Sequence, residues 1–307
     1  MPLLIHPQPL IDPISPALLS ADIAQLPKQA RLLAVGDFEV YCANAPCLPH
    51  ALQEIGRLRE LSFRAEGEGT GRPLDVDHYD ELYQHLLLWH PPSQQLVGAY
   101  RLGDTTELLA KYGTRGLYTH SLFAFGPELF EPLGPSLEMG RSFVRPEWQG
   151  STRALRLLWA GIAVLLEQRP HISCLFGPVS VSPRFSEFGR LLIMSTLQLH
   201  HTDPQLQRLI SARNAPVNGS QDLHKAARQA SQALADPVQL SKFLQHAEPG
   251  MPLPMLIKHY IELKGRFAGF NVDAAFNGTL DGLVFVRVQD IPAKMRARLT
   301  GTRPAPF

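Results

Sequence analysis

Glu138 and Arg141 stand three residues apart in the stretch SLEMGRSFVRPEWQGSTRAL, residues 136–155. A carboxylate and an arginine in an otherwise apolar strand are suited to acid–base chemistry, because the carboxylate can take a proton and the guanidinium can hold an anion. Residues three apart on a strand face opposite sides of the sheet. Both side chains therefore reach one site only if a β-bulge intervenes, and we place this bulge at Gly140.

The segment after this strand has the composition of a helix start that binds anions. Residues 144–155 predict the end of a strand, a polar turn and a helix over about residues 152–168, with Ser151 or Thr152 as N-cap. The first N–H groups of a helix have no partner within the helix and can bind phosphate. Three arginines add positive charge there: Arg145, Arg153 and Arg156. A capped helix with solvated arginines also fits these residue types.

Arg101 lies in a strand predicted after Pro92, between Tyr100 and Leu102. A buried arginine needs a carboxylate partner, and we expect Glu138 to be that partner. Such a pair is either part of a site or purely structural, and its residue types fit both interpretations.

A glycine-rich and then acidic segment precedes that strand, and we expect it to form a mobile loop. Its aspartates are Asp75, Asp77 and Asp80. On residue type alone, aspartates in such a loop are more often solvated or turn-forming than functional. The helix predicted before the loop, over residues 49–63, carries Arg59 and Phe63 one turn apart.

The whole chain has the composition of an ordinary globular protein. Its 307 residues are 45% apolar with a net charge of +1, which argues against a dedicated nucleic-acid binder. No apolar run approaches the roughly 20 residues of a spanning helix, and the N-terminus lacks a basic signal-peptide region. The three cysteines, Cys42, Cys47 and Cys174, show no metal-ligand spacing, so we expect reduced thiols and no metal site.

Strands that alternate with helices predict a mixed α/β or α+β fold. Residues 1–30 are rich in proline, and we expect them to form an arm outside a single domain over residues 31–307. Within that domain we expect a hairpin at Gly36 and Asp37, a mainly helical insertion at about 202–268 and a closing strand at about 281–289.

The turn at residues 144–154 resembles the acyl-donor loop of GNAT-fold acyltransferases, V-x-P-x-x-[QR]-G-x-G-x-[GA]. Here the run reads Val144, Pro146, Gln149, Gly150, Thr152 and Ala154, with threonine where the family has glycine. The resemblance implies a GNAT-like twisted mixed sheet flanked by helices. It also implies a donor, either acyl carrier protein with its phosphopantetheine thioester or acyl-CoA, and no tightly bound cofactor. The implied donor-binding residues are Phe143, Val144, Arg145, Gln149, Gly150, Ser151, Thr152, Arg153 and Ala154.

A second resemblance covers most of the chain. The series Arg59-x-x-x-Phe63, Asp77-x-x-Asp80, Arg101 and Glu138-x-x-Arg141 is similar to the pattern of acyl-homoserine lactone synthases. The runs LEMGRSFVRPEWQ, LFGPVSVS and GFNVDAAFNGTLDGLVFV are closer to the ornithine N-acyltransferase (hemolysin-like) group, which is related to N-acyl amino acid synthases. This resemblance implies transfer of a long, often 3-hydroxylated acyl chain from acyl carrier protein to an amino-acid amine, ornithine being an example.

The expected reaction is direct attack of the amine on the thioester, with Glu138 as base and Arg101 and Arg141 beside it. N–H groups at Phe143 and Val144 would hold the carbonyl oxygen. The remaining matched residues would bind the acceptor or order the loop: Arg59, Phe63, Asp77 and Asp80. Such an enzyme is expected in the cytoplasm, with transient contact to the inner membrane face.

Two alternatives stay open. One is an acyl-homoserine lactone synthase that takes S-adenosylmethionine as acceptor. The other is a module that binds acyl carrier or lipid without catalysis.

Overall fold

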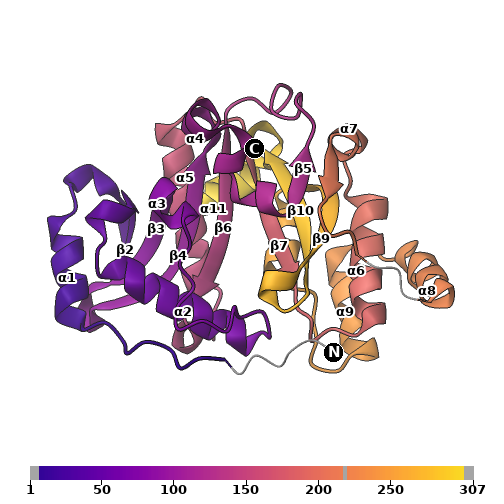
Figure 1. Ribbon diagram of the computed structural model, residues 1–307, viewed down its shortest axis with the longest axis horizontal. Helices are drawn as coiled ribbons and strands as arrows, with labels where there is room; N and C mark the ends of the chain where they lie inside the picture. Colours follow the sequence, from indigo (N-terminus) through magenta and orange to yellow (C-terminus); the bar gives the residue numbers. More distant parts are fainter. Residues whose placement is uncertain (1–6, 217–219, 301–307) are drawn as a thin grey trace. The chain divides into compact units, whose positions relative to one another are not determined.

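The structure is a computed structural model that describes residues 7–216 and 220–300. By its internal contacts the chain forms two compact units. Unit 1 contains residues up to 116, 137–172 and those from 293 onward, and unit 2 contains 117–136 and 173–292. Helices accompany the strands of both units, which confirms the predicted mixed α+β class (Figure 1).

Five strands of unit 1 pair in the order β1-β2-β3-β4-β6, and each pair of neighbours is antiparallel. They are β1 (Arg31–Val35), β2 (Phe38–Asn44), β3 (Gln84–His90), β4 (Gln95–Asp104) and β6 (Ser136–Val144). The predicted hairpin joins β1 to β2, with Gly36 at a φ of 58°. The sequence analysis misses β3, because its central residues are buried without the alternation of a half-exposed strand.

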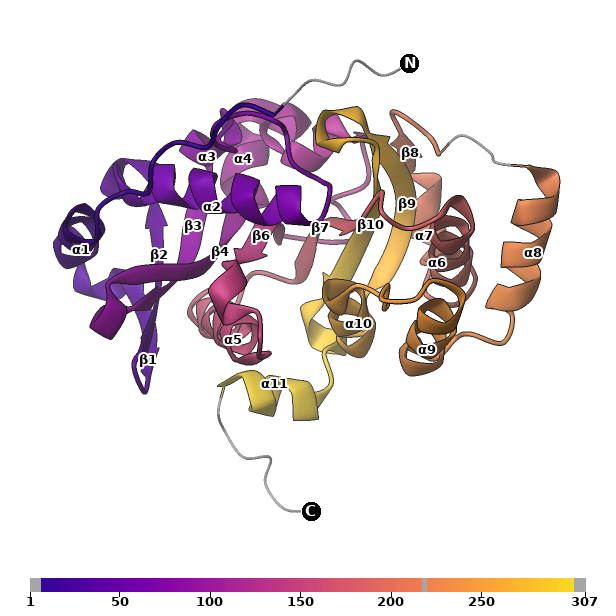
Figure 2. The same ribbon diagram turned by 90° about the horizontal axis from the view of Figure 1, so that it is seen from below.

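The helices of unit 1 cover both faces of these strands. Figure 2 shows α2 (Ala51–Ala65) on one side of the strands and α5 (Arg153–Gln168) on the other. The predictions for these two helices are confirmed to within a few residues. Short helices α3 (Tyr79–Leu82) and α4 (Thr105–Tyr112) flank β3 and β4, and α11 (Ala293–Thr300) packs against α5.

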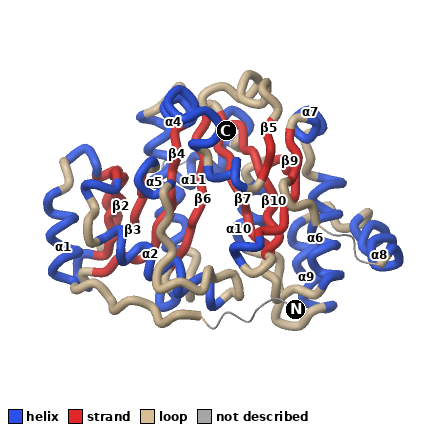
Figure 3. Tube along the Cα trace, in the orientation of Figure 1, coloured by secondary structure: helices blue, strands red, loops and turns tan. Residues whose placement is uncertain are grey.

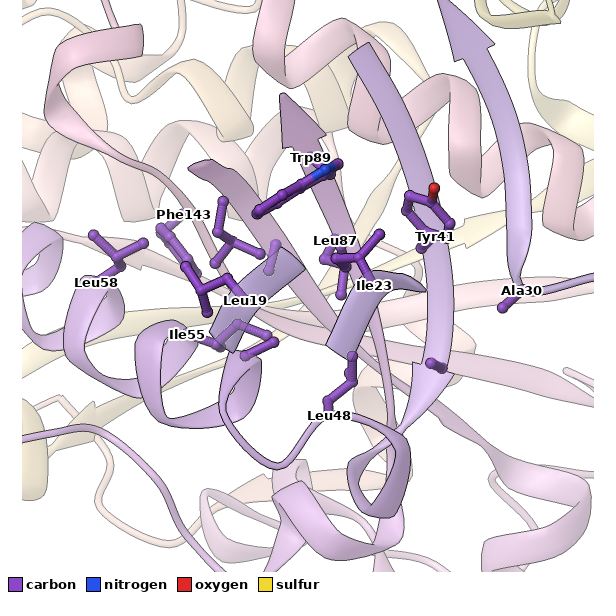
Figure 4. Close-up of a cluster of buried hydrophobic side chains, with 14 residues drawn as sticks. Leu19, Ile23, Ala30, Tyr41, Leu48, Ile55, Leu58, Leu87, Trp89 and Phe143 are labelled. Carbon is purple, nitrogen blue, oxygen red and sulfur yellow. The ribbon is translucent and has the colours of Figure 1, made fainter. Parts of the chain in front are cut away.

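The N-terminal segment differs from the predicted arm. Residues 16–25 form α1, which starts at Pro16 behind the N-cap Ser15. Its Leu19 and Ile23 lie one turn apart and enter a core cluster with residues of α2 and of strands β2, β3 and β6 (Figure 4). Each large apolar side chain buried in this way contributes about 1.5–3 kcal/mol. The spacing of two apolar residues among prolines was too weak a pattern to predict this helix.

Three strands of unit 2 pair antiparallel in the order β7-β10-β9, and a separate short pair joins β5 to β8. They are β7 (Cys174–Val181), β10 (Thr279–Arg287), β9 (Arg266–Asp273), β5 (Phe123–Phe125) and β8 (Ile210–Ala212). The helices of unit 2, which Figure 3 shows in blue, are α6 (Glu187–His200), α7 (Pro204–Arg208), α8 (Gln221–Ser231), α9 (Pro237–Ala247) and α10 (Met255–Glu262).

The last helix of unit 2 is shorter than its apolar spacing predicts. Apolar residues at helical spacing predict a helix from Pro254 to about Phe267, whereas α10 ends at Glu262 and Phe267 lies in β9. Lys264 adopts a φ of 66°, the left-handed conformation that terminates helices. A Cβ at Gly265 would lie 2.8 Å from the carbonyl oxygen of Tyr260, so the chain can turn closely there. No helix in the described part of the chain is long and apolar enough to cross a membrane.

Candidate functional site

The predicted bulge exists in β6, one residue later than expected. Gly140 pairs with Arg101 of β4, and Phe143 pairs with Ala99, so two residues of β6 lie opposite one of β4. The extra residues are Arg141 and Ser142, and Arg141 has a φ of 48°. A left-handed arginine in a strand re-aims its side chain at the point where the ladder is interrupted. Because of this bulge, Glu138 and Arg141 can face the same side of the sheet although they are three residues apart.

Glu138 is buried on β6 and accepts a short hydrogen bond from the hydroxyl of Tyr83. The Tyr83 hydroxyl also lies 3.3 Å from the carbonyl oxygen of Gly116. Glu138 pairs with Gly103 and Gly140 pairs with Arg101, so Glu138 and Arg101 share one face of the sheet. The candidate base is therefore held in place by a phenol that the sequence analysis did not include.

Arg101 has two aspartates as ion-pair partners. Its Nη1 lies 2.6 Å from Asp77 Oδ1 and 3.3 Å from Asp80 Oδ2. Asp80 in turn accepts a 2.7 Å hydrogen bond from Arg59, and Arg59, Arg101 and Asp80 are almost completely buried. The sequence proposed Glu138 alone as the partner, because the loop aspartates were expected to be solvated.

Arg141 closes this arrangement on the other side. Its Nε lies 3.1 Å from Asp75 Oδ2 and its Nη2 lies 3.3 Å from Asp77 Oδ2. The carbonyl oxygen of Asp75 lies 3.4 Å from Nη1 of Arg59. Three arginines and three aspartates thus alternate, and we call them the Arg–Asp network: Arg59, Asp80, Arg101, Asp77, Arg141 and Asp75.

The two arginines beside Asp80 keep its carboxyl charged. Burial alone would raise the pKa of the Asp80 carboxyl, but Arg59 and Arg101 outweigh burial and hold this pKa well below its usual range. Beneath the network, His85 lies 2.9 Å from the Asp80 carbonyl oxygen. Burial and the positive charge of Arg59 lower the pKa of His85 to about 4, so this histidine is neutral at physiological pH.

The segment between α2 and α3 is fastened to unit 1 rather than free. Phe63 is half-buried, and its carbonyl oxygen accepts hydrogen bonds from Glu66 and Glu68 where α2 ends. The buried Glu60 carboxylate accepts hydrogen bonds from the Thr70 hydroxyl at 2.7 Å and the Gly71 N–H at 2.8 Å. These contacts carry the glycine-rich segment over α2 and deliver the three aspartates to the network.

The start of α5 leaves N–H groups available. Thr152 is the N-cap and its side chain makes no capping hydrogen bond, whereas Ser151 Oγ accepts a 3.3 Å hydrogen bond from the Arg153 N–H. The N–H groups of Ala154 and Leu155, in the first turn, have no acceptor within the helix. These two N–H groups are available to a ligand, and anion binding at this helix start stays a prediction.

Other residues of the turn have structural contacts. Gln149 Nε2 donates a 2.7 Å hydrogen bond to the Val144 carbonyl oxygen and so closes the turn. Arg145 forms an ion pair with Glu147 at 3.0 Å, and the Arg153 guanidinium lies 4.7 Å from the ring centre of Phe38. Gly150 has open space at its Cβ position.

The two predicted oxyanion donors differ in direction. The N–H of Arg145 donates to Val97 of β4 at 2.9 Å. Because N–H groups alternate along a strand, the N–H of Phe143 also points toward β4, and that of Val144 points to the opposite edge of β6. Of the pair, Val144 is the donor directed away from the β4 ladder.

The cysteines fit the expected structural role. All three are free thiols: Cys42, Cys47 and Cys174. Burial raises the pKa of Cys174 to about 12, so this residue is an inert part of β7. Within the described residues no group of three or more His, Cys, Asp or Glu side chains is placed to hold a metal ion.

Sequence reasoning missed Tyr83, His85 and Glu60. A weak signal was present, because Tyr79 lies within the acidic segment and Tyr83 follows it at helical spacing. The Arg101 guanidinium lies 5.6 Å from the Tyr79 ring centre and 5.3 Å from the Tyr83 ring centre. Two tyrosines beside a buried arginine are a frequent cation–π arrangement.

Residues 58–160 match a family model described as an acetyltransferase (GNAT) domain. The chain is 36% identical over 208 residues to a glycine N(alpha)-acyltransferase of Phocaeicola vulgatus, which covers 63% of each protein. It is 34% identical over 206 residues to a protein of the same name from Bacteroides thetaiotaomicron, which covers 63% of this chain and 60% of that protein. The chain therefore spans less than two thirds of either curated relative.

Among solved structures, a CoA-dependent acyl-homoserine lactone synthase, MesI, aligns over 87% of this chain and 97% of its own. The identity is 13% and the TM-score is 0.37, a likeness too distant to support an activity. The match to the family model covers the candidate site. The Arg–Asp network, Tyr83, Glu138 and the start of α5 all lie within the stretch that matches the acetyltransferase (GNAT) domain.

Proposed function

We propose that the protein is an N-acyltransferase that moves a long acyl group from a thioester to the α-amine of an amino acid. The observation that carries this proposal is a buried carboxylate, Glu138, three residues before a bulge in the same strand. The GNAT match over residues 58–160 supports acyl transfer as the reaction class.

The names of the two curated relatives favour glycine over ornithine as the acceptor. Both acceptors offer an α-amine, whose pKa of about 7.7–8.0 is lower than the 10.4 or so of a lysine-like amine. Deprotonating the α-amine at neutral pH costs about 3 kcal/mol less. A single carboxylate base can therefore serve this acceptor.

In the proposed reaction the free amine forms a C–N bond to the thioester carbonyl carbon. Its proton passes to Glu138, directly or through a water molecule. The N–H of Val144 would stabilise the negative oxygen that develops. When the C–S bond breaks, the thiolate leaves with the proton that the amine gave up. The hydrogen bond from Tyr83 fixes the orientation of Glu138 during these steps.

The ion pairs of the Arg–Asp network fit a role in ordering the loop better than a role in binding the acceptor. Its three positive and three negative charges already pair with one another, so none of its carboxylates is left over for an incoming ammonium group. In this proposal the network fixes the wall of the site opposite β6, and the uncapped start of α5 binds the phosphate of the donor arm. Acyl carrier protein is the proposed donor, at the cytoplasmic face of the membrane.

A transfer assay tests the proposal directly. Purified protein is incubated with a long-chain acyl carrier protein thioester and with glycine, ornithine or S-adenosylmethionine, and the products are identified by mass spectrometry. We expect N-acylglycine from the wild type and a loss of at least about a hundredfold in Glu138→Gln. A lactone product, or no product with either amino acid, would contradict the proposed function.

A further inference from the structure

Unit 2 contains a cavity of about 640 Å³ along α6 and α8. It shares no residue with the Arg–Asp network or with Glu138, which belong to unit 1. The volume lies within the range of about 300–1,000 Å³ that is typical of sites for small organic ligands.

One side of the cavity is apolar. Met194 of α6 and Phe270 of β9 line it and are buried, and Leu199 near the end of α6 lines it and is 53% exposed. A single exposed leucine needs no explanation. Here, however, it lines the same cavity as two buried apolar residues, so the apolar lining includes both buried and exposed side chains.

The opposite side carries positive charge. Lys225 and Arg228 of α8 are exposed, line the cavity and stand three residues apart, which places them on one face of the helix. Neither forms an ion pair with a carboxylate in the part of the chain that the structure describes. Asp222, the acidic residue of the same helix, does not line the cavity.

An apolar lining beside two unpaired cations matches one ligand chemistry, a single-chain amphiphile with an anionic head. We propose that this cavity binds an N-acyl amino acid, the class of product that the proposed function assigns to the enzyme. The proposal rests on that function only for the identity of the amphiphile. Among the reactants and products, the N-acyl amino acid alone combines a long apolar chain with a free carboxylate on one small molecule.

The polar lining suits the rest of such a molecule. Gln198 of α6 also lines the cavity, and its side-chain amide can donate to and accept from the amide of an N-acyl amino acid. An amphiphile held here keeps its carboxylate at Lys225 and Arg228 and its chain on Leu199, out of water. Product released from the reaction centre would thereby stay on the protein until a bilayer or a second enzyme accepts it.

The test measures binding without turnover, so no acyl donor is present. N-palmitoylglycine, below the concentration at which it forms micelles, is titrated into the full-length protein by calorimetry. N-palmitoylglycine methyl ester and N-acetylglycine serve as ligand controls, since the first lacks the carboxylate and the second lacks the chain. We expect only N-palmitoylglycine to bind at micromolar concentrations.

The variants locate the binding site. Lys225→Glu combined with Arg228→Glu, and separately Leu199→Glu, are expected to weaken binding about tenfold. Lys242→Glu on α9 reverses an exposed charge of the same unit outside the cavity and is expected to bind as the wild type does. Thermal unfolding of each variant confirms its fold. Equal binding by all variants, equal binding of the methyl ester or no binding at all would overturn the proposal.

The two proposals fail separately. If glycine is not acylated but N-palmitoylglycine still binds in a way that depends on Arg228, the proposed function falls and the cavity remains a site for anionic amphiphiles. If glycine is acylated and the cavity variants bind N-palmitoylglycine unchanged, only the cavity proposal falls.

Discussion

The hydroxyl of Tyr83 donates a short hydrogen bond to the Glu138 carboxylate, and both side chains are almost completely buried. The bond links the residue that follows α3 to the centre of β6. It therefore connects the loop that carries the aspartates to the strand that carries the candidate base.

Tyr83→Phe removes this donor and leaves the ring in place. We expect kcat to fall about tenfold to a hundredfold with the KM of the acyl donor unchanged, because Glu138 loses orientation while donor binding at α5 is untouched. Stability should fall by about 1–3 kcal/mol, since a buried carboxylate loses a hydrogen bond. Steady-state kinetics and urea unfolding measure both effects. The control is Tyr112→Phe, because Tyr112 is 40% exposed; equal kinetics in the two variants would remove Tyr83 from the site.

Arg141 combines a left-handed backbone with two ion pairs, and two substitutions separate these features. Arg141→Ala and Arg141→Gly both leave Asp75 and Asp77 without this partner, at a cost of about 3–5 kcal/mol. Glycine tolerates a φ of 48° and alanine does not, so Arg141→Gly should be the more stable variant by about 1 kcal/mol. Urea unfolding of the two proteins gives this difference. The opposite order would show that the bulge relaxes once the arginine is gone.

The register of β4 and β6 depends on Gly98 rather than on Gly140. A Cβ at Gly98 would lie 2.6 Å from the carbonyl oxygen of Phe143, whereas a Cβ at Gly140 meets nothing within 4 Å. We expect Gly98→Ala to lower the free energy of unfolding by about 1–3 kcal/mol and Gly140→Ala to change it by no more than about 0.5 kcal/mol. The two variants are matched controls for each other in chemical denaturation. A large loss of stability in Gly140→Ala would support the bulge position that the sequence predicts.

The need for a bulge was predictable from the sequence, but its exact place was not. The spacing of Glu138 and Arg141 required an interruption of the strand, and glycine is the residue that most often permits one. In the structure Arg141 itself takes the left-handed conformation, and its ion pairs with Asp75 and Asp77 accompany that strain. These partners lie more than 60 residues away in sequence, beyond the reach of any local pattern.

The partners of Arg101 were likewise only partly predictable from the sequence. The cost of burying an unpaired arginine correctly predicted that Arg101 in β4 needs a carboxylate. The choice between Glu138 and the loop aspartates depended on how the glycine-rich segment crosses α2, which the buried Glu60 determines through contacts with Thr70 and Gly71. No local propensity encodes that path. The long amphipathic helices α2 and α5, by contrast, follow from apolar spacing alone.

His85 predicts how the stability of the protein depends on pH. Burial and Arg59 lower the pKa of His85 in the folded protein to about 4, while the unfolded value is about 6.5. The unfolded chain thus binds a proton first as the pH falls. Neutral His85 makes its full contribution to the free energy of unfolding above about pH 6.5. About 3 kcal/mol of that contribution is lost when the pH falls to about 4. Partial burial lowers the pKa of His259 to about 4 as well, and this residue adds a loss of the same sign.

His85→Gln should flatten this pH dependence, because glutamine does not titrate and its amide can still donate to the Asp80 carbonyl oxygen. The free energy of unfolding is measured by urea titration at intervals from pH 8 to pH 4. We expect the wild type to lose about 3 kcal/mol more than His85→Gln over this range. His171→Gln, at a side chain that is 54% exposed, is the matched control for the substitution itself. Equal slopes in the wild type and in His85→Gln would mean that His85 accepts its proton in the folded state as readily as in the unfolded chain.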